Sequence, residues 1–228
     1  MRLGLLNMPP VIIKRSQRKT LSIEVKPTNV IVRAPQQLDQ ATINNWVKSR
    51  EKWINQHWQS MQCQLIKRPT IEDGGFTYVK GRSYRLLFSD SKPNVVMDKK
   101  CIVVNANTKA KALNILKNWY IEQAKAYFRA RVDVLSKKLA LSTQVKGLSF
   151  RKTKTKWGHC TSKGHLQFNW LLMMMPEEVI DYVIVHELCH LIEMNHSKKF
   201  WSWVGTICPD YRQHINWLKF HQQQFWLD

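Results

Sequence analysis

The sequence predicts an α+β fold, in which an antiparallel, β-rich region with one helix precedes a region of long helices and a small sheet. Short β-branched and alternating segments separated by turn residues fill the first hundred positions, whereas helical periodicity dominates after Thr108. A hydrophobic content of 44% with only 8 Gly and 8 Pro supplies enough apolar surface for a core. We therefore expect the 228 residues to divide into two regions, 1–106 and 107–228.

The N-terminal region is expected to contain one helix among short strands. Asp39 can cap this helix, because its carboxylate can accept hydrogen bonds from free backbone N–H groups of the first turn. Apolar residues from Ile43 to Trp58 follow at helical spacing. The predicted strands are Val11–Lys14, Leu21–Lys26, Val30–Arg33, Phe76–Val79, Tyr84–Phe88, Val95–Met97 and Cys101–Val104. The second and third of these flank a Pro-Thr-Asn turn and should form a hairpin.

The C-terminal region is expected to hold two helices and a second hairpin. Thr108 is a good N-cap for a helix that runs to about Leu139. The extended segment Val145–Lys156 is predicted to turn back and pair with the alternating strand Leu166–Trp170, whose free edge could bind an extended peptide. Pro176 suits the start of the second helix. The two Glu residues that follow it lie in the first turn, where the positive end of the helix macrodipole stabilises acidic side chains.

Charge is a strong compositional signal. Lys and Arg number 36 against 16 Asp and Glu, which gives a formal net charge of +20 and an attraction to polyanions. Nucleic acid and nucleotides are therefore expected partners. One short tract offers four candidate polyanion contacts, Arg151, Lys152, Lys154 and Lys156.

The sequence also argues against several classes of protein. No apolar run reaches the roughly 20 residues that span a bilayer, so no membrane partner is expected. Pro9 and Pro10 interrupt the apolar N-terminus, which argues against a signal peptide and favours a cytoplasmic location. The 5 cysteines are dispersed and include no Cys-x-x-Cys pair, so neither a disulfide framework nor a zinc knuckle is indicated.

The most specific motif is His186-Glu187-Leu188-Cys189-His190, which has the H-E-x-x-H pattern and follows an apolar run. Two histidines four residues apart share one face of a helix, so both imidazoles can bind one Zn²⁺. Glu187 lies beside them and can act as a base toward water. The motif therefore predicts a zinc site with a catalytic carboxylate.

His196 is the expected third ligand. In an unbroken helix it would face away from His190, so the chain must turn before it. Asn195 tolerates the left-handed conformation that ends helices, and Ser197 can cap a new helix. Three protein ligands leave one position open for water, which is typical of catalytic zinc sites. We expect one Zn²⁺ per chain.

Known subclasses of zinc peptidases fit this region only in part. The metzincin pattern H-E-x-x-H-x-x-G-x-x-H matches all three histidines, but Glu193 stands at the Gly position and no Met follows Met194. Classes that use a downstream Glu as third ligand fail, because Glu193 is the last Glu in the chain. Asp210 is an alternative third ligand.

Residues around the motif form a wider pattern. It comprises Lys156-Trp157-Gly158-His159-Cys160, residues 161–164 and 166–169, the stretch from Tyr182 to His190, Asn195-His196-Ser197, Arg18-Lys19-Thr20 and residues 80–84. In these residues the chain resembles the YgjP-like metallopeptidase family, a relative of the SprT-like zincins, over nearly its whole length. That family usually has W-G-S-C and H-E-L-A-H, whereas this chain has His159 and Cys189 at the variable positions. The resemblance implies a zincin-like half that carries the active-site helix and a small sheet.

Together these features predict a zinc-dependent metallohydrolase. Zn²⁺ on the three histidines would lower the pKa of a water toward ~7, and Glu187 would accept its proton. Cleavage of peptides or unfolded proteins is the leading hypothesis. One alternative is a metal-dependent nucleoside triphosphate pyrophosphohydrolase, which the positive charge favours. Another is a nucleic-acid-associated binding protein with a structural zinc.

Three further residues are candidates for transition-state or substrate contacts. His159 could donate to a developing oxyanion, and Tyr211 and His214 could polarise a substrate carbonyl. Each also has a structural explanation, as a histidine at a strand end or as part of the aromatic core. Cys189 is expected to pack as a small hydrophobe rather than to bind metal.

Overall fold

The computed structural model describes residues 9–26, 28–66, 68–90 and 94–227. The chain forms two compact units, Met1–Lys67 and Arg68–Asp228. This division differs from the expected boundary at residue 106, which falls inside the second unit. Ala106, just before this boundary, and Ala112, just after it, are both buried in the same core, so strand and helix on its two sides belong to one unit.

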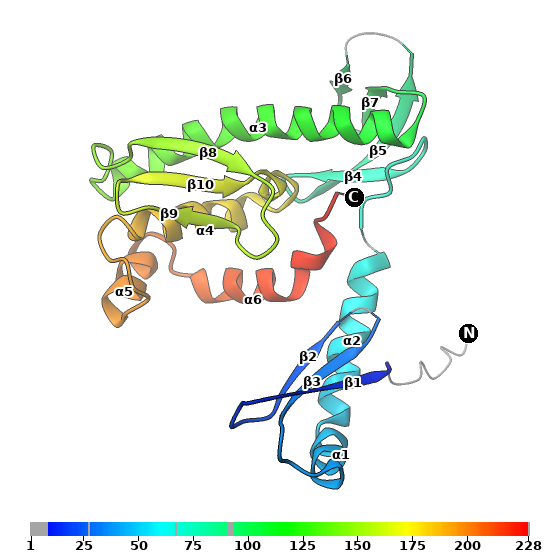
Figure 1. Cartoon of the computed structure of the whole chain (residues 1–228). Coiled ribbons are helices and arrows are strands. Elements are labelled where there is room, and N and C mark those ends of the chain that lie inside the picture. Colours follow the sequence, from blue (N-terminus) through cyan, green and yellow to red (C-terminus); the bar gives the residue numbers. More distant parts are fainter. Residues whose placement is uncertain (1–8, 27, 67, 91–93, 228) are drawn as a thin grey trace. The chain divides into compact units, whose positions relative to one another are not determined.

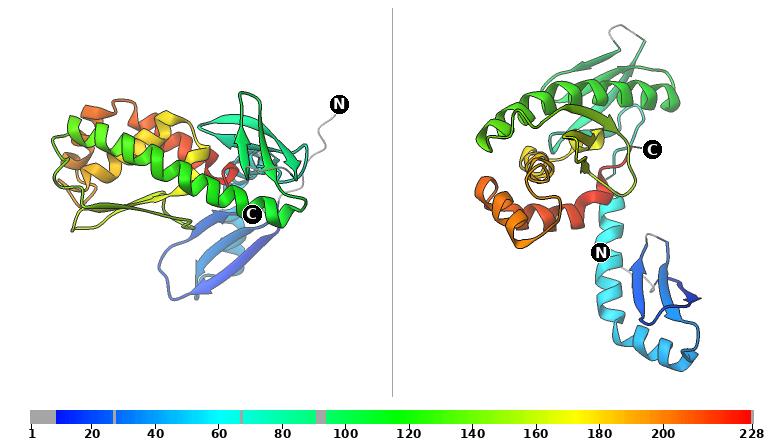
Figure 2. Two further views of the ribbon diagram at one scale, coloured as in Figure 1. Left: turned by 90° about the horizontal axis from the view of Figure 1, so that it is seen from above. Right: turned by 60° about the vertical axis from the view of Figure 1, so that its left-hand side comes forward.

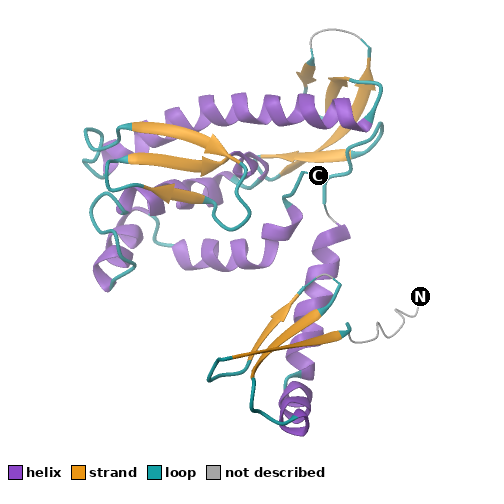
Figure 3. Ribbon diagram, in the orientation of Figure 1, coloured by secondary structure: helices purple, strands orange, loops and turns teal. Residues whose placement is uncertain are grey.

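The first unit is a three-stranded sheet with two helices (Figure 3). Its strands are β1 (Val11–Ser16), β2 (Ser22–Val25) and β3 (Val30–Pro35), in the order β1-β3-β2. The expected hairpin is present as the antiparallel pair β2 and β3, whereas β1 runs parallel to β3. Its core consists of aliphatic side chains from β3 and the helices, namely Val30, Val32, Ala34, Ile43, Val47 and Ile54.

The single helix expected in this unit is in fact two, α1 (Gln40–Ser49) and α2 (Glu51–Ile66). Asp39 caps α1 as predicted, and its Oδ1 accepts a 2.7 Å hydrogen bond from the Thr42 N–H. Arg50 separates the helices with a ψ of 4°, which departs from helical geometry. The apolar spacing continues across this break, which is why the sequence pattern did not reveal it.

The second unit begins with a four-stranded sheet in the order β4-β5-β7-β6. Its strands are β4 (Phe76–Val79), β5 (Arg82–Ser89), β6 (Val95–Met97) and β7 (Cys101–Asn105). Lys80 and Gly81 join β4 to β5 with φ values of 50° and 79°, the positive angles of a type I′ hairpin turn. Their N–H groups donate to the carbonyls of Met173 and Met174, at 2.8 and 3.0 Å. The turn is thereby attached to the segment that leads into the helix with the H-E-x-x-H motif.

Helix α3 (Lys109–Lys138) and the sheet β8-β10-β9 form the next layers (Figure 1). Thr108 caps α3 as predicted, by accepting from the Lys111 N–H at 3.3 Å. The sheet consists of β8 (Gly147–Arg151), β9 (Gly158–Cys160) and β10 (His165–Asn169). Helix α3 contacts β8, helix α4 contacts β9, and both helices lie on the same side of the sheet (Figure 2).

The predicted second hairpin is wrong in its pairing. Strand β10 is antiparallel to β9 and parallel to β8, so the hairpin joins β9 and β10 instead. The turn at residues 161–164 connects β10 to the short strand directly before it, while residues 152–157 carry the chain away from β8. The strand Leu166–Trp170 is therefore no free edge, because β10 is paired on both sides. Trp170 itself begins the 3₁₀ helix η1 (Trp170–Met174).

Three helices complete the second unit. They are α4 (Glu177–Cys189), α5 (Lys198–Ile207) and α6 (Tyr211–His221), followed by the 3₁₀ turn η2 (Gln222–Gln224). Helix α4 is buried over most of its length, which agrees with the apolar run before its histidines. Among the described residues, no helix has both the length and the apolar character needed to cross a membrane.

Candidate metal centre and active site

Helix α4 supplies the first two histidines. His186 lies in its last turn, and His190 follows directly as the C-cap residue. The rest of the helix is held in the core by side chains on several faces, among them Val183, Ile184 and Leu188. The His186 and His190 rings, with centroids 4.9 Å apart, project from the same face of this buried helix.

His196 joins the other two histidines because the chain reverses after α4. The turn is made by short-range bonds from the Leu191 and Glu193 N–H groups to the carbonyls of Leu188 and Cys189. Asn195 was expected to be left-handed, but the described non-Gly residues with positive φ are only Lys80 and Ala140. The predicted cap at Ser197 is present, since its Oγ accepts from the Phe200 N–H at 3.3 Å. A tight turn rather than a left-handed residue thus returns the chain to the site.

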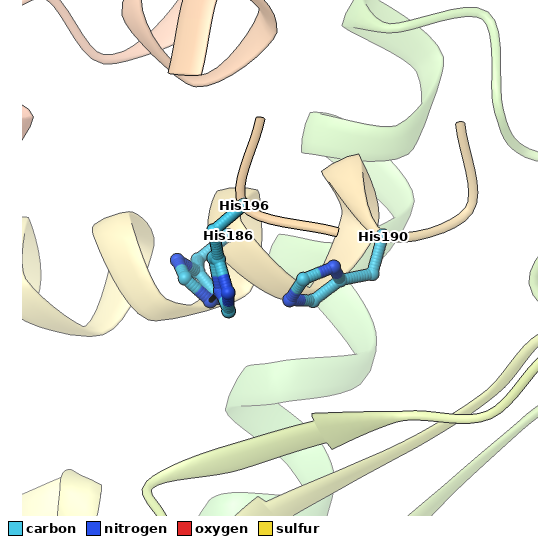
Figure 4. A group of neighbouring side chains, drawn as sticks. All are labelled: His186, His190 and His196. Carbon is cyan, nitrogen blue, oxygen red and sulfur yellow. Dashed lines mark hydrogen bonds between the residues drawn. The ribbon is translucent and has the colours of Figure 1, made fainter. Parts of the chain in front are cut away.

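One ring nitrogen of each of His186, His190 and His196 lies within 4.8 Å of the others. Figure 4 shows the three rings turned toward one another. The Nε2 atoms of His186 and His196 are 3.1 Å apart. Two lone-pair nitrogens at this distance require a proton or a cation between them, because otherwise their partial charges repel. The donor set therefore fits a metal that prefers imidazole, such as Zn²⁺.

Hydrogen bonds at the outer ring nitrogens orient two of these imidazoles. The Glu193 carbonyl, which can only accept, lies 3.1 Å from Nδ1 of His190, so Nδ1 carries the hydrogen and Nε2 keeps a lone pair. The Tyr182 hydroxyl lies 3.5 Å from Nδ1 of His186. Partners of this kind fix the ring orientation of metal-binding histidines and raise their basicity.

Two of the imidazoles, those of His186 and His190, have lowered pKa values, which favours the neutral form that binds metals. Burial lowers the pKa of His186 to about 3, and the neighbouring His190 and His196 act in the same direction. Burial also lowers the pKa of His190, although its bond to the Glu193 carbonyl opposes this effect. Neutral rings can offer a lone pair to a cation without first losing a proton.

Glu187 lies beside the histidines with only 5% of its surface exposed. Burial raises the pKa of its carboxyl to about 8, while the nearby Lys156 ammonium lowers it. Its carboxylate rests on the backbone of β9 at Gly158. A β-carbon at Gly158 would come within 2.4 Å of the Glu187 Oε1 atom, so the carboxylate occupies space that only glycine leaves free.

A cleft with a volume of about 420 Å³ opens over these groups. The residues of β9 form one wall, and Tyr182, Met194 and the three histidines contribute to the others. Among the described lining residues, Glu187 is the only carboxylate and Lys156 the only Lys or Arg. The arrangement can bring water and a substrate to the histidines beside a single buried base.

Of the three other candidate contacts, only His159 lines the cleft. His159 is exposed on the β9 wall of the cleft. Tyr211 does not line it, but stacks on Trp201, which in turn stacks on His196 with ring centroids 5.2 and 5.8 Å apart. His214 stacks on the Tyr182 ring at 6.0 Å and is also outside the lining. Asp210, the alternative ligand, is not in the histidine cluster.

The four basic residues from Arg151 to Lys156 also differ in whether they line the cleft. Lys156 lines the cleft, whereas Lys152 donates a 2.6 Å hydrogen bond to the Leu227 carbonyl. Arg151 and Lys154 are exposed outside the cleft. Cys189 is fully buried, and this burial raises the pKa of its thiol to about 12, which suits an inert packing residue.

Sequence reasoning did not identify Gly158, Tyr182 or the Glu193 carbonyl as parts of the site. Gly158 carried a usable signal, because a glycine inside a strand indicates a bulge or a close approach by another group. Tyr182 stands four residues before His186, a spacing that brings two side chains together on a helix. The Glu193 contact is made by backbone after a turn, and no residue type signals it.

Three imidazoles around one point, with a buried carboxylate beside them in an open cleft, define the class of metal-dependent hydrolases. The family model described as "YgjP-like, metallopeptidase domain" matches residues 19–221. The chain therefore belongs to the YgjP-like metallopeptidase domain family.

Two individual proteins can be compared with the chain. An Escherichia coli (strain K12) protein named "UTP pyrophosphatase" is 28% identical over 102 residues, which cover 43% of this chain and 57% of that protein. The chain thus spans little more than half the length of this curated relative. The crystal structure of the metallopeptidase zymogen of Pyrococcus abyssi abylysin superimposes with a TM-score of 0.37 and 21% identity, covering 41% of this chain and 94% of that one.

Proposed function

We propose that this protein is a zinc-dependent hydrolase that cleaves nucleoside triphosphates to nucleoside monophosphate and pyrophosphate. His186, His190 and His196 would hold one Zn²⁺ per chain, and Glu187 would serve as general base. The proposal reverses the order of preference that the sequence suggested, in which peptide cleavage came first. The similarity to the E. coli protein named UTP pyrophosphatase supports this order.

The observation that carries the proposal is the positive charge of the chain, which reaches the lining of the cleft at Lys156. The one described carboxylate of the cleft is the proposed base, and its one described Lys or Arg, Lys156, lies close enough to act on that carboxylate. These two charges offset each other, so the attraction for a polyphosphate comes from the net charge of +20 of the chain, and Lys156 is the residue that brings a cation to the lining of the cleft. A peptide backbone carries no charge and needs no cation there.

Each side chain has a separate part in the proposed reaction. A bound zinc supplies Lewis acidity, which polarises a phosphate oxygen and acidifies water. Glu187 would accept a proton from the attacking water, because its carboxyl faces the cleft next to the histidines, where a bound dication would lower the pKa that burial raises. Lys156 offsets part of the charge that the substrate brings. The Tyr182 hydroxyl and the Glu193 carbonyl hold two of the imidazoles in place.

Product analysis tests the proposal directly. Zinc-loaded protein should release pyrophosphate from nucleoside triphosphates, lose this activity with a chelator and recover it with added Zn²⁺. Elemental analysis should find about one zinc per chain, with His196→Ala lowering the zinc content and the exposed His57→Ala of the first unit leaving it unchanged. Protein without a transition metal, or without any metal-dependent pyrophosphate release, would contradict the proposal.

Peptide cleavage is a second candidate that one feature favours. Strand β9 forms a wall of the cleft, and among the described strands it pairs only with β10, so its other edge can accept an extended peptide by backbone hydrogen bonds. New amino termini from an unfolded protein substrate, produced with zinc and absent in Glu187→Gln, would favour this candidate.

A further inference from the structure

A second cavity lies directly beside the cleft. It has a volume of about 360 Å³ and shares His190 and Met194 with the cleft, so the two spaces adjoin at a proposed metal ligand. Its remaining wall comes from the loop before β8 and from the turn between β9 and β10. The polar side chains that matter here are Lys146, Thr161, Ser162 and Lys163.

Backbone contacts hold these two segments together. Within the turn, the Gly164 N–H donates to the Thr161 carbonyl at 2.9 Å, and the Lys146 N–H donates to the Gly164 carbonyl at 2.8 Å. Gly164 has a φ of 79°, and a β-carbon there would come within 2.1 Å of the Gln144 carbonyl oxygen. Because only glycine permits this close approach, the loop and the turn have a fixed relation. Lys146 and Lys163 thereby line the same cavity.

The chemistry of this wall is that of an anion site. Neither lysine is within ion-pair distance of a carboxylate in the part of the chain that the structure describes. Lys146 Nζ donates to the Thr143 carbonyl at 2.8 Å, which orients the ammonium but leaves its charge unpaired. Thr161 Oγ1 accepts from the His165 N–H at 3.1 Å, so its own hydrogen is available to a ligand. None of the described lining residues is an Asp or Glu.

We propose that this second cavity binds the β- and γ-phosphates of a nucleoside triphosphate whose α-phosphate lies at the histidines. The inference rests on the proposed function and adds the place of the leaving group. Water attacks the α-phosphorus and gives a proton to Glu187. The bond between this phosphorus and the α–β bridging oxygen breaks, and the oxygen leaves with pyrophosphate. Lys146 and Lys163 donate charged hydrogen bonds to the β- and γ-phosphates of the substrate and to the pyrophosphate product.

Kinetics with two substrates tests the site. For a nucleoside triphosphate, Lys146→Ala/Lys163→Ala should raise KM and the inhibition constant of inorganic pyrophosphate about 10-fold each, because charged hydrogen bonds to phosphate are lost. Hydrolysis of bis(4-nitrophenyl) phosphate, which has no β- or γ-phosphate, should be unchanged. Lys146→Arg/Lys163→Arg should retain most of the parent affinity. The matched control is Lys117→Ala, which removes an exposed lysine of α3 that lines neither cavity.

A binding experiment separates this inference from the proposed function. Inorganic tripolyphosphate should bind the zinc-loaded full-length protein, and the double alanine variant should bind it about 10-fold more weakly at constant salt. If the parent protein hydrolyses no nucleoside triphosphate but shows this lysine-dependent binding, the proposed function fails and the anion site stands. If the double variant and Lys117→Ala behave alike in binding and in KM, the site is refuted whatever the reaction is.

Discussion

The two compact units differ in the number and size of the side chains that their cores bury. The first unit buries a small aliphatic cluster of Val30, Val32, Ala34, Ile43, Val47 and Ile54. The second unit fully buries large aromatic side chains, which include Tyr120, Phe128, Phe168, Trp170 and Phe200. All three histidines of the candidate centre lie in the second unit.

This difference in burial gives a physical reason for the position of the candidate site in the second unit. A shallow core cannot remove a carboxylate and an imidazole from water, whereas the core around α4 leaves Glu187 5% exposed and holds His186 neutral. Desolvation strengthens every electrostatic interaction within the site. The second unit therefore supplies the low-dielectric surroundings that a buried base requires, and substitutions in the two units should have different consequences.

The largest difference between substitutions in the two units is expected for turnover when the proposed base, Glu187, is removed. Glu187→Gln keeps the side-chain shape and all three histidines but cannot accept a proton, so turnover should fall ~10²–10⁴-fold while zinc stays bound. The matched change Glu51→Gln, on an exposed helix residue of the first unit, should leave turnover unchanged. Parent-like turnover of Glu187→Gln, measured alongside zinc content, would exclude Glu187 as the base.

A smaller but more specific effect is expected at Gly158. The added methyl of Gly158→Ala must displace the Glu187 carboxylate, and a misplacement of about 1 Å can cost about 10²-fold in rate. The loss should appear in kcat rather than KM, with zinc retained. Gly205→Ala is the matched control, because a β-carbon there meets its nearest neighbour at an ordinary 3.6 Å.

Shortening the base should compensate in part for the methyl at Gly158. The double variant Gly158→Ala/Glu187→Asp should lose less activity than the product of the two single losses, because the two changes act on the same space. If the loss of activity in the double variant equals the product of the two single losses, Gly158 does not position Glu187.

Core substitutions should separate the units by their effect on metal. Leu188→Ala and Ile43→Ala both remove fully buried side chains, and each should cost about 2–5 kcal/mol in the free energy of unfolding of its own unit. Leu188 lies between the two histidines of α4, so its loss should also lower zinc affinity. Denaturant titration with zinc analysis should show normal zinc content in folded Ile43→Ala, and a loss there would contradict the assignment of the whole site to the second unit.

The smallest expected difference between the units is in the free energy of unfolding lost when an ion pair is broken. Arg131 donates from Nε to Asp181 Oδ1 at 2.9 Å and makes a second contact through Nη2, and both side chains are about two-thirds buried at 32% and 29% exposure. Asp181→Asn should cost about 1 kcal/mol. Glu24→Gln breaks the more exposed pair with Arg33 in the first unit and should cost only about 0.3 kcal/mol. Equal costs in chemical denaturation would remove this distinction between the units.

Local sequence signals predicted most elements of the fold. The caps at Asp39, Thr108 and Ser197 all make the hydrogen bonds expected of them, because capping depends on one side chain and its next three residues. Pairing between strands was harder to predict. The alternation in Leu166–Trp170 indicates a strand but does not say whether a neighbour runs parallel or antiparallel, so β8 was assigned to the wrong hairpin.

The candidate site was predictable to the extent that it is local. His186 and His190 share a helical face by spacing alone, and His196 needed only the inference that the chain turns. The contacts of Gly158 and of Lys146 and Lys163 come from strands and loops distant in sequence. No periodicity encodes them, because they arise only once the sheet has packed on α4.

The turn at Lys80 and Gly81 has a consequence for the order in which the second unit folds. Its bonds to the carbonyls of Met173 and Met174 can form only after the long intervening segment has closed into a loop, and the entropy of that closure delays such contacts. Residues 186–196 can gather their imidazoles through one helix and one turn, without waiting for this closure. The part of the site that is local in sequence can therefore form before the turn that anchors the entrance to α4 has docked.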